Sequence, residues 1–407
     1  MGGGPIHPVS LMNKGGSRMK FRFSFTKNTI FFIAATLAMA AMILYGINSE
    51  IDYSPVFSEG VSFPTGKVVD LVSDQTEVDE YGLHRGRQDL RVKILSGEHR
   101  DEVIDVIYTL SIDHNVYAKK GQRLIIYYDQ QPGDDYYFAT VHSYERSWTI
   151  YIVVGLFLCL LSVVGGKTGI RSAFGLIFTF VVIIFFLVPL IIKGAPPVWL
   201  SLGMVLCIIA VSLISMLGFT KKAYVGILGT GIGVVLCCVF FVLISAALHI
   251  TGYSVPDMDS LIVIAYNTNI KVGDFLFCGV LIASLGAVMD VSVSVASSVA
   301  ELSETYKNAS FEGLLRSGVK IGRDIVGSMA NTLILAFTGS FFTTLIMLRI
   351  YEVQYNRLIN LNEIAIELLQ AITASSALIL CAPITAYFAA RLYSGARRSR
   401  VRAFFAK

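Results

Sequence analysis

Asp290 is the residue with the clearest chemical potential, because it interrupts a run (275–300) that carries no other charged side chain. An ionised carboxylate in the hydrocarbon of a bilayer is expensive, and such groups usually face a bundle interior or an aqueous path. In a helix Asp290 shares one face with small and polar residues, namely Ala283, Gly286, Ala287, Ser294, Ser297 and Glu301. The opposite face holds leucine and valine. Oxygen atoms on this stripe can coordinate a cation or relay protons.

Two further apolar runs carry polar faces at the same three-to-four-residue spacing. One contains Asp324, Gly327, Ser328, Asn331 and Thr338; the other contains Glu367, Gln370, Thr373 and Cys381, with Pro383 after them. Polar stripes combined with helix breaks are typical of substrate or ion paths in transporters. The predicted path is therefore made of Asp290, Ser294, Ser297, Asn331, Thr338 and Gln370. The alternative is that Asp290 is protonated, or paired with an asparagine, and only locks helices together.

Arg323 and Asp324 lie where the apolar run 325–348 is about to begin. At the mouth of a membrane helix this pair can form a gate. An aspartate near a helix N-terminus is also favourable for the helix dipole, so capping is an equally good interpretation.

The composition places these residues in a membrane protein. Of the 407 residues 54% are hydrophobic and 15% are charged, whereas about a quarter of a soluble domain is charged. A membrane helix needs roughly 20 apolar residues. Eight runs meet this requirement: 28–49, 147–166, 172–192, 194–220, 223–256, 275–300, 325–348 and 368–390. An even number of spans puts both termini on the same side.

The distribution of lysine and arginine sets the orientation, because short cytoplasmic loops retain these residues. Alternate loops and the two termini place nineteen of them inside and four outside, leaving aside the polar insert. The first run can also be a signal peptide, but its length and the absence of a clear cleavage site favour an anchor. Residues 1–18 are expected to be disordered, and Met19 is a second candidate start.

Residues 48–147 hold 28 of the 62 charged residues and are net acidic, which indicates one polar domain outside the membrane. Partial alternation predicts strands at 90–95, 103–107, 123–128 and 136–141. About five short strands indicate a small barrel of SH3-like or OB-like type. Such a module can pack on the bundle or on a partner; an OB-like barrel can also bind oligomers. Its four histidines match no local metal motif.

Other local patterns indicate packing. Gly166-Lys167-Thr168 lacks the first glycine and the preceding strand of a phosphate-binding loop. The glycines between 226 and 233 lack a dinucleotide fingerprint and form a small-residue face suited to close helix packing. All six cysteines lie in apolar runs, where a thiol behaves as a small hydrophobe. The sequence shows no catalytic nucleophile paired with a general base, so we do not expect an enzyme.

Four segments of the chain carry a family resemblance. They are Gly286-Ala287-Val288-Met289-Asp290-Val291-Ser292-Val293-Ser294, residues 321–336 around Arg323, Asp324, Asn331 and Thr332, and the shorter Lys167–Arg171 and Val188–Ile191 segments. In these segments the chain resembles the YibE/F family of bacterial multi-pass membrane proteins. It covers roughly residues 28–395. It implies a plasma-membrane protein of a family described as permeases of unknown substrate, and it assigns no role to these residues.

We therefore expect an α-helical polytopic membrane protein with eight transmembrane helices and an extracytoplasmic β-barrel-like insert between the first and second. The expected parts are a basic cytoplasmic leader (1–27), an anchor (28–49), the β domain (50–146), a seven-helix bundle (147–392) and a basic cytoplasmic tail (393–407). The leading hypothesis is a secondary transporter that couples a proton or cation at Asp290 to a small solute, without a cofactor or a bound metal. The alternative is a scaffold or sensor whose β domain binds an envelope protein. The sequence leaves open whether the chain forms homo-oligomers, and we do not expect a nucleic-acid partner.

Overall fold

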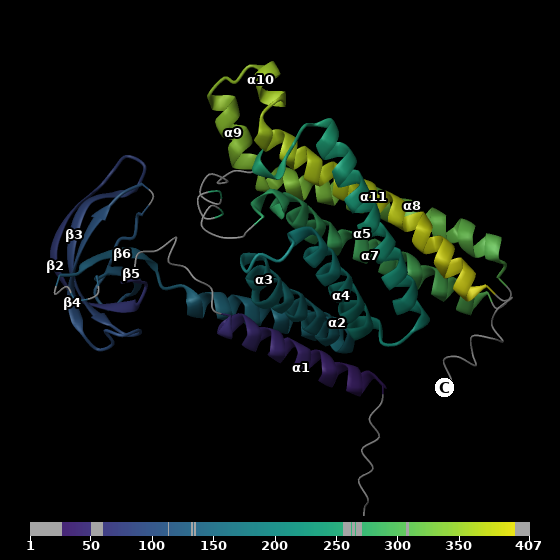
Figure 1. Cartoon of the computed structure of the whole chain (residues 1–407), viewed down its shortest axis with the longest axis horizontal. Coiled ribbons are helices and arrows are strands. Elements are labelled where there is room, and N and C mark those ends of the chain that lie inside the picture. Colours follow the sequence, from purple (N-terminus) through teal and green to yellow (C-terminus); the bar gives the residue numbers. More distant parts are fainter. Residues whose placement is uncertain are drawn as a thin grey trace, which may run out of the picture.

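The computed structural model describes residues 27–394 except 50–59, 113, 132, 134–135, 255–261, 263–264, 266–270 and 307–308. The predicted leader, apart from Lys27, and the tail from residue 395 lie outside the described residues. A β domain stands at one end of a longer helical bundle, and the two are joined where the last strand leads into α2 (Figure 1).

Six antiparallel strands form the β domain. They are β1 (Val61–Ser62), β2 (Thr65–Val78), β3 (His84–Ile94), β4 (Val103–Leu110), β5 (Arg123–Asp129) and β6 (Phe138–Tyr144). Their order is β1-β5-β2-β3-β4, and β6 pairs with the other edge of β5. The sheet curls into a half-barrel, because β2 bends at two register shifts and pairs with β3 along most of its length and with β5 at its start.

Alternating side chains explain why the sheet closes around one core. In β4 every second residue is buried, and β3 and β5 contribute a further row of aliphatic side chains that includes Leu90, Val92 and Ile126. The four predicted strands are confirmed. The sequence pattern missed β2, because its second half is exposed on both faces and is mostly polar.

Helices, most of them long and apolar, make up most of the rest of the described chain. They are α1 (Lys27–Asn48), α2 (Ser147–Val182), η1 (Ile183–Leu187), α3 (Val188–Ile192), α4 (Pro197–Leu217), α5 (Lys221–Ala247), α7 (Phe275–Thr305), α8 (Phe311–Ser340), α9 (Phe342–Ile350), α10 (Tyr355–Ile359) and α11 (Asn362–Tyr393). Within the described residues, six helical segments are long and apolar enough to cross a membrane. The pair α8 and α9, bent by 55°, forms a seventh if it is one span.

One of these six segments, Ser147–Ile192, is 46 residues long and contains a reversal. Gly166 has a φ of 54° and a ψ of −135°, outside the helical region. A Cβ on Gly169 would overlap the carbonyl oxygen of Leu161, although eight residues of straight helix would separate the two by about 12 Å. The chain therefore folds back near Gly166. The two arms on either side of it are similar in length to the predicted apolar runs 147–166 and 172–192.

The core of the bundle lies where α5, α7 and α11 pack against one another (Figure 1). Val288, Val291, Val295 and Val299 of α7 are completely buried. They fit against faces of α5 and α11 that are rich in glycine and alanine, so branched side chains fill the space that small residues leave open. This packing decides which face of α7 points inward.

Candidate functional site

The polar stripe of α7 lies on the exposed side of the helix. Asp290, Gly286 and Ala283 are exposed, and Ser294 and Ser297 are half-buried. The valine face packs inside instead, so the expectation that Asp290 faces the bundle interior is wrong for the single chain. The physical reason is that the valines contribute far more apolar contact area than the small stripe does. An ionised aspartate exposed to hydrocarbon at the centre of a helix costs about 2.5–3.5 kcal/mol.

The polar stripe of α8 is exposed as well. Asn331 and Thr338 are both exposed, and no residue of α8 beyond Gly322 is fully buried. The hydroxyl of Thr338 donates to the carbonyl of Ile334 in its own helix, 2.8 Å away. Among the described residues, Asp290 and Asn331 make no side-chain hydrogen bond or ion pair. The alternative in which an asparagine neutralises Asp290 is therefore not realised among the residues that the structure describes.

Arg323 and Asp324 lie well inside α8, because this helix begins at Phe311. Its N-cap is Ser310, whose hydroxyl accepts a hydrogen bond from the backbone N–H of Gly313 at 3.1 Å. The interpretation of Asp324 as a helix cap is therefore wrong. Both residues are exposed, and neither makes a side-chain hydrogen bond or ion pair with another described residue.

Two close contacts set the relative heights of α7 and α8. A Cβ on Gly322 would lie 3.5 Å from Val295, and one on Gly318 would touch Val299 one turn further along. The helices run antiparallel with a rise of 1.5 Å per residue, so Asp290 lies about 7 Å beyond Val295 and level with Gly327. Arg323 lies about one turn to one side of that level, and Asn331 about one turn to the other. The described helices thus bring the polar groups of α7 and α8 to within about one turn of a common level.

The third stripe, on α11, points inward. Thr373 and Cys381 are completely buried and Gln370 is half-buried. This stripe therefore faces α5 and α7, while the stripes of α7 and α8 face outward. Gln370 makes no hydrogen bond to Asp290 or Asn331. The three stripes that share one spacing in the sequence do not converge on one cavity.

A buried polar cluster that the sequence pattern missed lies between α5, α7 and α11. The hydroxyl of Ser292 lies 2.9 Å from the Cys381 thiol and 3.2 Å from the Thr385 hydroxyl. The thiol is 3.3 Å from the carbonyl oxygen of Gly229, and Thr385 donates to the Cys381 carbonyl at 2.8 Å. About two helical turns further along, Cys237 and Ser284 are 3.3 Å apart.

This cluster connects helices and leaves little room for a ligand. Ser292, Thr385 and Cys381 are completely buried, and Gly229 and Gly233 lie so close to them that a Cβ at either position would overlap their side chains or Val288. The predicted packing face on α5 is confirmed for Gly226, Gly229 and Gly233, which are all buried; Gly231 lies off it. Ser292 was missed because it lies on the valine side of α7.

Three cavities open elsewhere in the described part of the chain, and Asp290 lines none of them. One of about 730 Å³ lies between the end of α7 and the start of α8. The β domain has a cavity of about 620 Å³ beside His99 and Tyr128, and one of about 370 Å³ beside His114 and His142. The rings of this histidine pair are 5.8 Å apart. No group of three or more potential metal ligands occurs among the described residues.

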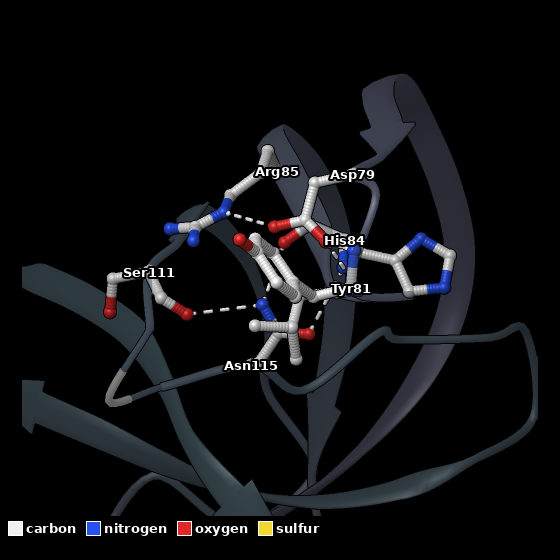
Figure 2. A network of polar contacts seen from close by, with 7 residues as sticks. Asp79, Tyr81, His84, Arg85, Ser111 and Asn115 are labelled. Atoms are coloured by element: carbon white, nitrogen blue, oxygen red, sulfur yellow. Dashed lines mark hydrogen bonds and ion pairs between the residues drawn. The ribbon is translucent and has the colours of Figure 1, made fainter. Parts of the chain in front are cut away.

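A polar network ties the β2–β3 turn to the loop before β5 (Figure 2). Asp79 accepts hydrogen bonds from the backbone N–H groups of Leu83 and Tyr81 at 2.9 and 3.0 Å and pairs with Arg85 at 3.1 Å. Asn115 bonds both backbone groups of His84, accepting from the N–H at 3.2 Å and donating to the carbonyl at 2.6 Å. The network holds a long, mostly exposed hairpin against the barrel.

Acid should loosen this turn. The N–H of Leu83 does most to hold the pKa of the Asp79 carboxyl below its usual range, and Arg85 and Tyr81 act in the same direction. A lowered pKa in the folded state stabilises the fold at pH values above the ordinary aspartate pKa of about 3.9, and this stabilisation is lost as the pH falls through the lower folded value. Hydrogen exchange of residues 79–85, corrected for the intrinsic pH dependence, should therefore accelerate below about pH 4.

The test compares two single variants, Asp79→Asn and Glu80→Gln. Glu80 is the control position, because it is a neighbouring exposed acid without a hydrogen bond among the described residues. Asp79→Asn should be weakly protected at every pH, and Glu80→Gln should behave as the unchanged chain does. Equal pH profiles for the two variants would contradict the role of Asp79.

Comparison with known families agrees with the helical architecture. The model of the family described as YibE/F-like protein matches residues 153–395, which run from α2 to just past the end of α11 and include both Asp290 and Asn331. The match does not extend to α1 or the β domain, over which the sequence resemblance was also expected. Searches among curated proteins and solved structures found no match. The chain therefore belongs to the YibE/F-like family.

Proposed function

We propose that this chain is a permease of the plasma membrane in which Asp290 binds a proton or a cation and couples its movement to that of a small solute. The observation that carries the proposal is a set of polar groups on α7 and α8 that have no side-chain partner among the described residues. Asp290, Arg323 and Asn331 lie within about one helical turn of a common level, on exposed faces of two neighbouring apolar helices. Ionisable groups kept at such a cost in a membrane usually serve transport.

Helix breaks support the same proposal. The π-helical turn Ile183–Leu187 ends two residues before Pro189, and α8 and α9 meet at a bend of 55°. Discontinuous helices of this kind commonly line the solute and ion sites of secondary transporters. Counting the two arms around Gly166 separately, and α8 with α9 as one, we propose eight membrane spans. Both termini are then cytoplasmic, and the β domain lies outside.

Transport can be tested in inverted membrane vesicles energised by respiration, with a fluorescent probe of the pH gradient. Sodium, potassium, magnesium and calcium salts, amino acids and small organic acids are added one at a time. At least one should dissipate the gradient in vesicles that contain the protein. Asp290→Asn keeps the shape of the side chain but removes its charge, so it should reduce this response to that of vesicles lacking the protein.

The matched control is Glu301→Gln, the same loss of charge on the same exposed face, three turns nearer the end of α7. It should leave the response unchanged. If no addition dissipates the gradient, or if Asp290→Asn retains the full response at equal protein levels, coupling through Asp290 is wrong.

A scaffold or sensor is the second candidate, favoured by the cavity of about 620 Å³ in the β domain. Its walls combine the Phe63 and Tyr128 rings with the polar side chains of Glu98 and His99. Convergent polar groups in an apolar concavity are typical of binding sites. If the chain is a scaffold or sensor, the vesicle response should be absent and Asp290→Asn should have no effect. Glu98→Ala should instead disturb the function of the protein in cells.

A further inference from the structure

Two histidines from different parts of the β domain lie side by side in the folded chain. The ring centres of His114 and His142 are 5.8 Å apart, and both residues line the cavity of about 370 Å³. We propose that this pair binds one divalent transition-metal ion of the class that includes zinc, nickel and copper. The inference goes beyond the proposed function, because it involves neither Asp290 nor transport.

The pair bridges the seam of the half-barrel, which is defined here as the junction of β4 and β6. β1 and β2 pair with one edge of β5 and β6 pairs with the other, so β4 and β6 are the outer strands of the sheet. These two strands lie beside each other, but no backbone ladder joins them in the described part of the chain. His142 belongs to β6, and His114 follows the end of β4. An ion held by both rings therefore connects the two edges.

A β-bulge positions His142. In the register of β6 on β5, Val141 and Ser143 pair with consecutive residues, so His142 between them is the extra residue of the bulge. Bulges commonly redirect a side chain beside a functional site. The ring of Phe63 meets the His142 ring edge-on, with the centres 5.1 Å apart, and so supports its orientation.

Backbone hydrogen bonds hold His114 in place. Its N–H donates to the Ser111 hydroxyl at 3.1 Å, and its carbonyl accepts from the Ser111 N–H at 3.1 Å. The same carbonyl accepts from the hydroxyl of Tyr108, a buried residue of β4. A ligand whose backbone is fixed before the ion arrives loses less conformational entropy on binding.

The two imidazole rings are available as ligands. Neither makes a hydrogen bond or an ion pair with another described residue, whereas the ring of His99 pairs with Glu102 at 3.1 Å. Two imidazoles on one zinc ion have ring centres roughly 5–6 Å apart, since each Zn–N bond is about 2.0–2.1 Å long. The separation of 5.8 Å lies in this range.

The walls of the cavity select the class of ion. Among the described residues, the side chains that line it beside the two histidines are hydroxyl-bearing, aromatic or aliphatic, and none is a carboxylate. Calcium and magnesium prefer several oxygen ligands, including carboxylates, whereas imidazole suits zinc, nickel and copper. With two protein ligands, the other coordination positions are left to water or to an exchangeable anion. Such an open site suits reversible capture of the ion, because closed structural zinc sites use four protein ligands.

Hydrogen exchange of the full chain in lipid nanodiscs, titrated with zinc, tests the site. Zinc should slow the exchange of residues 114–118 and 138–144, because the ion connects both sides of the seam. Magnesium at the same concentrations should have no effect. His114→Asn and His142→Asn should each raise the zinc midpoint at least about tenfold, since losing even a hydrogen-bond partner of a metal ligand typically costs 10–100-fold in affinity.

His99→Asn is the matched control, because it removes a histidine of the same domain that lines the other cavity. It should leave the zinc midpoint unchanged. His114 and His142 are both exposed, so replacing them should not unfold the domain, and the protection of β3 without zinc checks this. The proposal is overturned if zinc protects neither segment, if either His114→Asn or His142→Asn keeps the original midpoint, or if magnesium protects equally well.

Discussion

Alanine at Gly229 should lower the free energy of unfolding of the bundle by about 1–3 kcal/mol, the usual cost of overfilling a packed core. The added methyl group would lie 2.9 Å from the Ser292 hydroxyl and would overlap that of Thr385. These atoms belong to two different helices, α7 and α11, so the strain cannot be relieved by rotating one side chain. The hydrogen bonds that join Ser292 to Cys381 and Thr385 would be disturbed at the same time.

The same substitution two residues away provides the control. A Cβ on Gly231 would meet Leu206 at 3.8 Å, an ordinary van der Waals contact. Since alanine is favoured over glycine inside a helix by roughly 1 kcal/mol, Gly231→Ala should be neutral or slightly stabilising. Thermal unfolding midpoints of the purified full chain in lipid nanodiscs measure both. A Gly229→Ala midpoint at or above that of Gly231→Ala would contradict the packing described for α5.

Leucine at Gln88 should destabilise the β domain by about 2–4 kcal/mol, the cost of leaving two buried backbone groups unpaired. Gln88 is completely buried in β3. Its amide oxygen accepts from the N–H of Ala118 at 3.0 Å, and its amide nitrogen donates to the Ala118 carbonyl at 3.3 Å. Leucine has a similar size but makes neither bond, so the segment before β5 loses two of its hydrogen bonds to the sheet.

Gln75→Leu is the matched control, because Gln75 lies exposed in the neighbouring strand β2, opposite Arg87. It should change stability by less than about 0.5 kcal/mol, as surface substitutions usually do. Hydrogen exchange of residues 114–128 in the full chain measures the effect. Exchange should accelerate for Gln88→Leu and stay unchanged for Gln75→Leu. Unchanged protection in both would show that Ala118 finds other partners.

Local patterns were sufficient for most of the elements. Charge-free runs predict the apolar helices because a membrane span needs only length and apolarity, and alternation predicts β3 to β6 because one face of each strand is buried. The same reasoning missed β2, whose second half has no buried face to leave a pattern. It also placed the start of α8 too late, because Phe311–Asp324 carries several charges and continues the helix outside the apolar run.

Asp290 shows where local patterns stop being sufficient. Helical spacing correctly separates a polar from a valine face, but spacing alone does not say which face packs inside. That depends on the partners: the glycine-rich face of α5 and the alanine-rich face of α11 accept Val288 and Val295, and the polar face is left outside. The expectation that Asp290 faces a bundle interior or an aqueous path rested on its charge and on its small, polar stripe, whereas the packing of the single chain followed the valines.

The sequence by itself determined that this is a membrane protein with an acidic β insert, and its motifs pointed to the YibE/F-like family, because composition, run length and motif spacing are local properties of the chain. Only the tertiary structure decided that Ser292, Cys381 and Thr385 meet Gly229, and that Asp290, Arg323 and Asn331 lie within about one turn of a common level on exposed faces of α7 and α8. Contacts between residues 63 to 156 positions apart depend on which helix faces fit together. That fit is a property of three packed helices at once, and no single run of residues contains it.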